Sequence, residues 1–544
     1  MEPTGLLGPR AAPRSYLLSP MAPTPNGRLH LGHMAGPYLK LDLLARHLRR
    51  RGDRAAYIFG SDIYETFVML RAELDGVTPR AVCDRFHPLM KEDLAALRIE
   101  CEYFYPFEPR FHDRFDAIHL EVMRRLVSRR TVVPVRERLP YNPRRQRFEL
   151  GYALLGNCPH CGSGAGSYYC EECGYHFQPE LMSCAHSRFG DDLEWRDVEC
   201  LFLRIADVGR LTELIAAMGV PDVFKDICAA YLTKQGAKIR LTVPGAWGLP
   251  WDAAPGGPQV LYSYPFLFAF YLMCGERYGE LTGTRENPFA LDSAVTTISA
   301  FGIDNTIPMM VGVLGAAISH GGYKPFDHYL GNHFCNLEGS KFSTSREHAI
   351  WAADIVRKTP IASDSVRYYL TKMNPEHAPT SFSLHDLVAT TNTSLAGALQ
   401  QAIGHAAAAW VGEPGAAPQG LLERLDALLA SQGAALDPRR FQMAETARAL
   451  DAWVAEHREL TAAGASAYWW LKGLSLLASP ILPDMAIALW RQLGHDGEPA
   501  TAELTRPRPT GPGPAGFVPP TFFSPIQLSQ LVPCLPDSLR GAFP

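Results

Sequence analysis

The sequence has no apolar run long enough to cross a bilayer and no marked excess of charge of either sign. None of its hydrophobic stretches approaches the ~20 residues that a transmembrane helix needs, and residues 1–14 contain neither the apolar core of a secretory signal nor an amphipathic basic helix. With 52 Lys and Arg against 56 Asp and Glu, the net charge of −4 argues against a generally basic, nucleic-acid-binding surface, although a local basic patch stays open. We therefore expect a cytoplasmic protein without membrane contact.

Apolar residues are nevertheless abundant enough to bury two or three cores, because 47% of the 544 residues are hydrophobic and 20% are charged. Short apolar runs at 16–19 and 55–59 predict buried strands, and apolar positions at helical spacing predict helices over 33–51 and 64–74. This alternation predicts an α/β fold with a Rossmann-like, doubly wound parallel sheet. Ligands of such sheets lie at the carboxyl ends of the strands.

Two changes of character divide the chain further. Arg-, Tyr- and Cys-rich sequence interrupts the alternation, and Ala- and Leu-rich helical patterns later replace it; these cover 385–410, 421–432, 441–460 and 468–493. A Pro- and Gly-rich stretch then predicts an extended tail. We therefore predict a sheet domain in two halves (1–107 and 199–380), a connective domain inserted between them (108–198), an α-helical bundle (381–505) and a Pro-rich tail (506–544).

Four of the twelve cysteines form two close pairs. Cys158 and Cys161 are separated by two residues, eight residues follow, and Cys170 and Cys173 repeat the spacing. This pattern is typical of tetrahedral zinc held by four thiolates, which leaves no open position for catalysis. We predict a structural zinc ion here, with His160 as an alternative ligand. The other eight cysteines are predicted to be buried thiols.

Two short motifs carry the candidate chemistry. His30-Leu31-Gly32-His33 lies between the first predicted strand and helix, where backbone N–H groups and two imidazoles suit a polyanion and Gly32 lets a flat base approach. Surface histidines at a helix start are the alternative for this motif alone. Residues 338–346 form a loop of small residues that carries Lys341, which suits a mobile clamp on a triphosphate.

These motifs, the cysteine pairs and the bundle together resemble class I aminoacyl-tRNA synthetases, and methionyl-tRNA synthetases in particular. The resemblance covers residues 15–494. The first motif matches the first family signature, and residues 341–345 match the second, Lys-Met-Ser-Lys-Ser. Residues 364–369 and 479–483 match as well.

The resemblance implies a ligase that uses Mg²⁺ and ATP to convert an amino acid into its aminoacyl-adenylate, with release of pyrophosphate. It implies that His30 and His33 stabilise charge on the phosphates and that Lys341 holds the leaving pyrophosphate. Asp62 matches the aspartate that binds the substrate ammonium group; an ordinary helix N-cap is the alternative. The implied ATP-binding residues are Asn26, Gly27, Gly32, Asp304, Ser343 and Ser345.

The second signature departs from the family. Thr344 stands where methionyl enzymes carry a second lysine, so a cation near the transition state is missing. Loss of such a group commonly lowers the rate about 10²-fold. Arg28 and Arg346 are candidates to replace it.

The predicted amino-acid pocket departs too. Ala22 and Thr24 replace Leu and Tyr of the family, Tyr264 stands at a tryptophan position, and Tyr271 is retained. Bulky Met21, Tyr64 and Met309 favour a small amino acid such as glycine, whereas Thr24 and Asn305 offer groups to a polar side chain. Core packing is the alternative for the aromatic run 262–271. The predicted amino-acid-binding residues are Ala22, Thr24, Asp62, Tyr64, Tyr264, Tyr271, Asn305 and Met309.

The bundle is a third departure. Gln401 and His405 stand where methionyl enzymes read the anticodon with Asn and Arg, and Trp453 lies near the third such position. Residues 381–544 contain 10 Lys and Arg against 14 Asp and Glu, a net charge of −4, with one lysine. Phosphate contacts dominate affinity for RNA, so tRNA is disfavoured as a partner.

We therefore predict a paralogue of specialised metabolism that adenylates an amino acid and transfers the acyl group to a small acceptor. An N-hydroxylated amino acid is such an acceptor in the methionyl-synthetase-like components of hydrazine-forming enzymes. A zinc cupin that forms the N–N bond would be a separate protein, because the chain has no spare segment of that size. Two alternatives stay open: a methionyl-tRNA synthetase that charges tRNA, and a non-catalytic paralogue, against which the retained His30, His33, Lys341 and Asp62 count.

Overall fold

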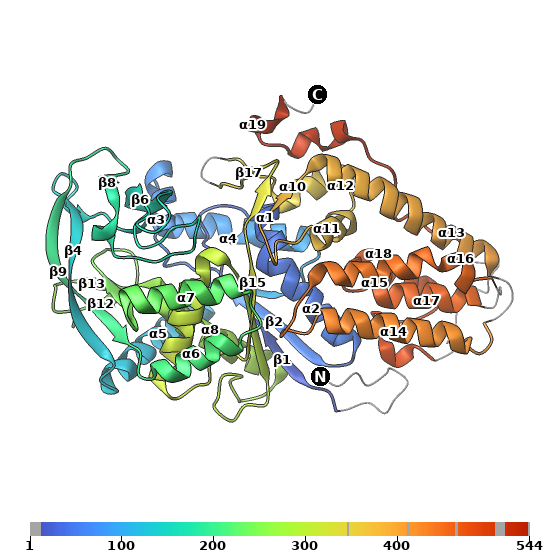
Figure 1. Ribbon diagram of the computed structural model, residues 1–544, viewed down its shortest axis with the longest axis horizontal. Coiled ribbons are helices and arrows are strands. Elements are labelled where there is room, and N and C mark those ends of the chain that lie inside the picture. Colours follow the sequence, from blue (N-terminus) through green and yellow to red (C-terminus); the bar gives the residue numbers. More distant parts are fainter. Residues whose placement is uncertain (1–11, 345–346, 411–413, 463–465, 506–516, 542–544) are drawn as a thin grey trace.

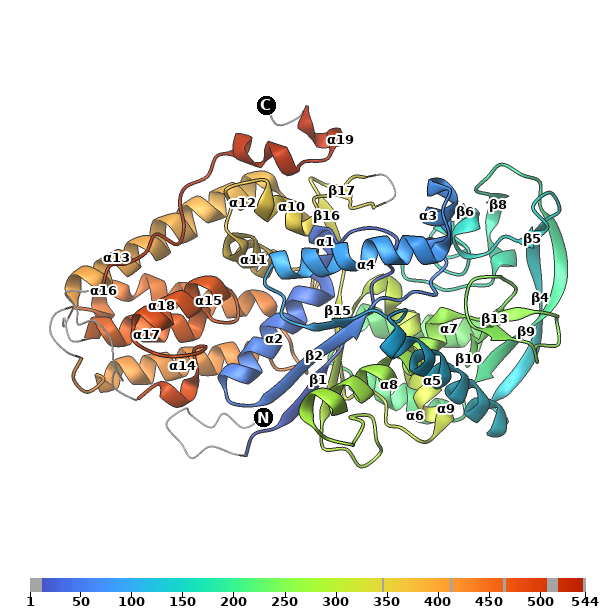
Figure 2. The same cartoon turned by 180° about the vertical axis from the view of Figure 1, so that it is seen from behind.

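The structure is a computed structural model that describes residues 12–344, 347–410, 414–462, 466–505 and 517–541. A five-stranded parallel sheet of order β15-β14-β1-β2-β3 lies at its centre (Figures 1 and 2). Because the order reverses between β1 and β14, the prediction of a doubly wound sheet is confirmed. The strands are β1 (Ser15–Leu18), β2 (Arg54–Gly60), β3 (Glu102–Phe104), β14 (Thr296–Gly302) and β15 (His328–Asn332).

The strands are buried on both faces, as a parallel sheet requires. Leu18 points into one core and its neighbour Leu17 into another. Helices α2 (Leu39–Arg50) and α11 (Ser363–Lys372) contribute to the first core. Helices α5 (Pro109–Ser128), α8 (Ser263–Thr282) and α9 (Leu314–His320) contribute to the second.

The chain between β3 and β14 adds a second, antiparallel sheet of order β10-β9-β4-β5 at the left of Figure 1. Its long strands are β4 (Val132–Asn142) and β9 (Glu194–Arg204), with β5 (Arg147–Phe148) and β10 (Lys238–Arg240) at the edges. The cysteine pairs lie beside a small sheet of β6 (Leu154–Asn157), β7 (Gly164–Gly166) and β8 (Ser183–Ser187). The domain boundaries given above remain a prediction.

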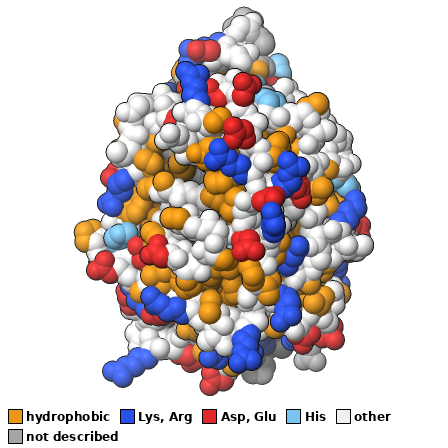
Figure 3. Space-filling model, turned by 90° about the vertical axis from the view of Figure 1, so that its left-hand side faces the viewer, with side chains coloured by type: hydrophobic (Ala, Val, Ile, Leu, Met, Phe, Trp, Pro, Cys, Tyr) orange, Lys and Arg blue, Asp and Glu red, His pale blue; other side chains and the backbone are white. Residues whose placement is uncertain are grey.

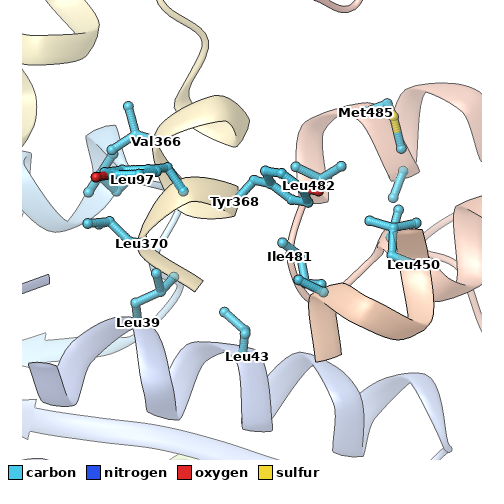
Figure 4. Packing of buried hydrophobic residues seen from close by; sticks show 14 of the residues in the cluster. Leu39, Leu43, Leu97, Val366, Tyr368, Leu370, Leu450, Ile481, Leu482 and Met485 are labelled. Carbon is cyan, nitrogen blue, oxygen red and sulfur yellow. The ribbon is translucent and has the colours of Figure 1, made fainter. Parts of the chain in front are cut away.

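The helices between residues 384 and 492 form a bundle packed on the first core. Figure 4 shows Leu39 and Leu43 of α2 beside Val366 and Leu370 of α11, with Ile481 on the bundle side. The sequence pattern over 468–493 divides into two helices, because Pro480 and Pro483 interrupt the chain between them. The bundle helices are α12 (Leu384–Thr390), α13 (Gln400–Ala409), α14 (Gln419–Ala435), α15 (Met443–Ala455), α17 (Ala467–Ala478) and α18 (Pro483–Gln492).

The last described segment returns to the body of the protein. The Gln400 side chain donates to the Pro520 carbonyl and accepts the N–H of Phe522. The segment ends in α19 (Asp537–Arg540), which lies near α10 (Ala352–Arg357) at the top of Figure 1. Among the described helices, none is both long and apolar enough to span a membrane.

Candidate active site

Four neighbouring strands of the parallel sheet end at one cavity of about 410 Å³. Residues just after β1, β2, β14 and β15 all line it, as expected for a doubly wound sheet. The cavity brings together most of the predicted site residues: Ala22, Thr24, Asn26, His30, Gly32, His33, Asp62, Tyr264, Asp304, Asn305, Lys341 and Ser343. Gly27, Tyr64, Tyr271 and Met309 are not among the lining residues, and Ser345 lies outside the described residues.

The two signature histidines hold each other in place. His30 is the N-cap of the one-turn helix α1 (Leu31–His33), and each ring accepts the other residue's backbone N–H at Nδ1, over 3.2 and 3.3 Å. The rings stack with centroids 3.7 Å apart. Burial lowers the pKa of His30 well below its usual value and that of His33 to about 4. Both imidazoles are therefore neutral, with the proton on Nε2, ready to donate to a phosphate oxygen.

The second signature lies against the first. Phe342 stacks on His30 with centroids 4.7 Å apart. A Cβ on Gly32 would lie 2.8 Å from the Phe342 ring, and a Cβ on Gly27 would lie 2.2 Å from the Thr344 methyl group. Only glycine permits such close approach. Phe342 thus packs against Gly32, and Gly32 itself lines the cavity.

Lys341 is held by the cysteine-pair segment. Its Nζ lies 2.9 Å from Glu171 and 3.4 Å from Glu172, the two residues between Cys170 and Cys173. Burial opposes the charge on Lys341, but these carboxylates outweigh it and raise the pKa of the ammonium group. The ammonium must leave this acidic pair before it can bind a pyrophosphate group.

Arg28, one candidate to replace the missing signature lysine, lines the cavity but is already paired. Its guanidinium group is bound by Asp93 at 2.7 Å and by Asp354 at 2.7 Å. Asp93 also accepts the backbone N–H groups of Leu29 and Ala353. Arg346, the other candidate, lies outside the described residues.

The opposite end of the cavity is acidic. Asp62 is buried, and its Oδ2 has no hydrogen-bond partner among the described residues. Burial, reinforced by neighbouring Glu65, raises the pKa of Asp62 to about 8. Asp304, which also lines the cavity, interacts with both Glu171 and Lys341; burial and Glu171 raise its pKa to about 6. An unpaired buried carboxylate is completed by a cationic group, so this end suits a substrate ammonium.

Two predicted pocket residues lie in the core behind the cavity. The Tyr271 hydroxyl donates to the Pro20 carbonyl at 3.2 Å and lies 3.4 Å from Met309 Sδ, and both residues are fully buried. Tyr64 instead donates to Asp116 at 3.0 Å and lines a separate space of only about 20 Å³, which Asp62 also lines. Such a space holds one water molecule.

The sequence reasoning missed residues that line the cavity. Tyr169 and Glu171 come from the cysteine-pair segment, and Glu65 belongs to the loop after β2. Glu65 accepts the Phe67 N–H at 2.5 Å, at the start of α3 (Phe67–Asp75). The two adjacent glutamates inside the second Cys-x₂-Cys are a sequence signal for a segment that binds a cation. Spacing alone does not show that the knuckle reaches the active site.

The four paired cysteines converge as a metal site requires. Their sulfur atoms all lie within 4.8 Å of one another, with Cys158–Cys173 at 3.8 Å and Cys161–Cys170 at 3.6 Å. Tetrahedral zinc with bonds of about 2.3 Å places sulfur atoms about 3.8 Å apart, so the four thiols fit the ion. His160 instead stacks on Tyr175.

Comparisons with known proteins agree with this arrangement. A family model described as tRNA synthetases class I (M) matches residues 16–406, more than half of the chain. A methionine–tRNA ligase of Chlorobaculum tepidum is 28% identical over 528 residues, covering 89% of this chain and 74% of its own length. That of Cytophaga hutchinsonii is 26% identical over 396 residues, covering 70% and 57%.

Solved structures show the same fold. The methionyl-tRNA synthetase of Mycobacterium tuberculosis bound by methionyl-adenylate has a TM-score of 0.70 at 17% identity, covering 94% of this chain and 99% of that one. Its free form gives 0.67 at 16% identity, covering 96% and 100%. This chain spans between about half and three quarters of the length of the curated relatives named above. It belongs to the class I aminoacyl-tRNA synthetases of the methionine group, a family of ligases.

Proposed function

We propose that the chain activates an α-amino acid with ATP and forms an aminoacyl-adenylate. One observation carries the proposal: an unpaired buried carboxylate, Asp62, and a pair of neutral imidazoles, His30 and His33, line a single cavity at the carboxyl ends of the sheet. The amino-acid ammonium group would bind Asp62. Its carboxylate oxygen would then form a bond to the α-phosphorus while the bond to the β-phosphate oxygen breaks and pyrophosphate leaves.

The residues of the chain act on charge and position in this step. The Nε2–H groups of His30 and His33 donate to phosphate oxygens, which gain charge as the leaving group departs. Lys341 binds the pyrophosphate after its own ammonium group has left Glu171 and Glu172. Asn26, Gly27, Gly32, Asp304 and Ser343 remain the proposed ATP-binding residues. If ATP carries Mg²⁺, the ion supplies further positive charge to the phosphates.

We infer that the activated amino acid has a side chain smaller than that of methionine. Met309 and Tyr271 pack against each other in the core, and the space beyond Asp62 measures only about 20 Å³. Tyr264 lines the main cavity, and its ring packs against the rings of Tyr169 and His176. A long substrate side chain could enter this region only by displacing closely packed aromatic groups, which would strain the structure.

The acceptor has two candidates. The curated relatives are methionine–tRNA ligases, which supports transfer to tRNA. The bundle favours a small acceptor instead, because Trp453 is fully buried and donates to the Trp470 carbonyl, and so offers no exposed ring to a base. In the same bundle, the His405 ring lies 3.0 Å from a ring nitrogen of His457. At the opposite, connective-domain end of the protein, Figure 3 shows charges of both signs mixed over the surface. An N-hydroxylated amino acid and a cupin partner remain predictions.

Amino-acid-dependent exchange of pyrophosphate into ATP tests the activation step. We expect exchange with at least one small amino acid and its loss in His33→Ala. A charging assay with total tRNA then separates the acceptors. Absence of exchange with every amino acid, tested with and without tRNA, would contradict the proposal.

A further inference from the structure

A second cavity, of about 260 Å³, lies where the bundle meets the sheet domain, and it shares no lining residue with the active-site cavity. Its floor is formed by Lys40 of α2, Gly331 of β15 and Glu376. One wall is the 219–221 loop between α6 (Val208–Ala217) and α7 (Asp222–Gln235), and the other is the 439–442 loop between α14 and α15. Three separate parts of the chain thus enclose it.

The two walls are fixed to each other by close backbone contact. A Cβ on Gly219 would lie 2.6 Å from the Arg439 carbonyl oxygen and 2.7 Å from that of Pro438. Glu376 in the floor is fixed as well, because the Met443 N–H donates to both of its carboxylate oxygens, at 3.0 and 2.8 Å. The cavity is therefore a built feature of the domain junction.

Lys40 is an incompletely satisfied cation at the floor. The side chain is 0% exposed, and its Nζ donates to one neutral acceptor, the Gly331 carbonyl oxygen, at 2.8 Å. The Glu376 carboxylate, which lines the same cavity, favours the charge on Lys40. An ammonium group has three donors, so two donors of Lys40 have no hydrogen-bond acceptor among the described residues. Burial lowers the pKa of Lys40 to about 8, although Glu376 opposes the shift.

Two arginines supply more positive charge at the mouth of the cavity. Arg439 and Arg440 are exposed. The nearest carboxylate to Arg439 is Asp437 at 4.0 Å, and Arg440 has no ion pair within the described part of the chain. Three cations (Lys40, Arg439 and Arg440) against two carboxylates (Glu376 and Asp437) leave one net positive charge at the cavity. Ammonium and guanidinium groups together are the usual partners of phosphate oxygens.

We propose that this junction cavity binds a small phosphate-bearing metabolite, with phosphate oxygens bonded to Arg440 at the mouth and attracted by the buried charge of Lys40 beneath them. The cavity volume of about 260 Å³ favours a small molecule over RNA. A backbone phosphate of RNA carries a nucleoside on each side and does not fit such a space. A bound phosphate would link the 439–442 loop of the bundle to the floor formed by β15, whose last residue, Asn332, lines the active site with the following His333.

Inorganic phosphate is the probe for this site, and calorimetric titration of the full chain is the measurement. A Lys341→Ala background weakens phosphate binding in the active site, which isolates the junction cavity. We expect binding in this background to weaken at least about tenfold in Arg440→Gln, because a hydrogen bond between charged groups is lost. Arg458→Gln, which removes another exposed bundle arginine outside the cavity, is the matched control and should leave the affinity unchanged.

Lys40→Met tests the floor directly and should abolish binding; should that variant fail to fold, the Arg440→Gln result decides. Equal affinities in Arg440→Gln and Arg458→Gln would overturn the proposal, as would competition of phosphate with ATP. Displacement of phosphate by a tRNA transcript, dependent on Arg440, would assign the site to RNA and overturn the small-molecule ligand. The test does not depend on whether the chain activates an amino acid.

Discussion

The two ends of the active-site cavity differ in how closely they keep the pattern of the family. At the end that we assign to the nucleotide, His30 and His33 cap one helix turn and stack on each other, as the matching first signature is kept. At the end that we assign to the amino acid, Tyr264 stands at a position where the family has tryptophan, and Met309 lies against Tyr271. This difference is the basis of our proposal that phosphate chemistry is retained while side-chain selection has changed.

The largest effect should come from the nucleotide end. His33→Ala removes one phosphate donor and one half of the reciprocal cap, so we expect amino-acid-dependent exchange to fall about 10²- to 10³-fold. The loss should appear in kcat more than in the KM for the amino acid. A matched control is His348→Ala, which removes a histidine that lies outside the cavity lining and pairs with Ser538. Equal losses in both variants would contradict the assigned role.

Asp62→Asn tests the amino-acid end, and we expect exchange to fall about 10²-fold, mainly through a higher KM for the amino acid. The pKa of Asp62 is raised to about 8, so the free site is largely protonated at neutral pH. The KM of the unaltered protein should therefore fall roughly tenfold between about pH 6.5 and 8.5, as the carboxylate ionises. The variant should lose this dependence. A flat KM profile in the unaltered protein would contradict the account.

The raised pKa of Asp62 also makes the stability of the fold depend on pH, and in the opposite direction. Between the unfolded pKa of Asp62, 3.8, and its folded pKa of about 8, the folded state holds a proton that the unfolded state has released. The contribution of Asp62 to stability is therefore fully present below the unfolded pKa and is lost as the pH rises through the folded pKa. Asp62→Asn should raise the Tm at pH 8.5 relative to the unaltered protein and change it less at pH 5.

Met309→Ala tests the amino-acid end further, and the expected effect is of intermediate size. Removing the side chain that packs on Tyr271 opens space behind the amino-acid end, and we expect relative exchange with larger amino acids to rise about tenfold. The buried cavity should also destabilise the fold by about 2–5 kcal/mol, which a denaturant titration measures. Met310→Ala, an equally buried neighbour, is the control for general loosening. The same gain in both variants would remove Met309 from the specificity account.

The smallest effect should come from the acidic pair that holds Lys341. Glu171→Gln with Glu172→Gln releases the lysine, and we expect the KM for ATP to fall about two- to fivefold, since exposed ion pairs contribute little. Glu180→Gln, an exposed glutamate of the same domain, serves as control. A higher KM for ATP in the double variant would show that the acidic pair assists nucleotide binding instead.

Local sequence patterns predicted the sheet and the knuckle, and most of the residues predicted for the site line the cavity. Strand, glycine loop and helix at residues 16–51 are encoded by neighbouring residues, and so are the paired cysteines. The positions of Tyr64, Tyr271 and Met309 were not predictable in the same way. Each depends on packing between elements far apart in the chain, such as those that carry Tyr271 and Met309, which are 38 positions apart. The contact of Lys341 with Glu171, 170 residues away, is a further example.

Pyrophosphate exchange measured separately with each proteinogenic amino acid tests the central claim most directly. The account predicts exchange that depends on His33 and is strongest with an amino acid smaller than methionine. Exchange strongest with methionine would contradict the altered side-chain selection and leave the activation chemistry in place. No exchange with any amino acid, in the presence and absence of tRNA, would contradict the activation chemistry itself.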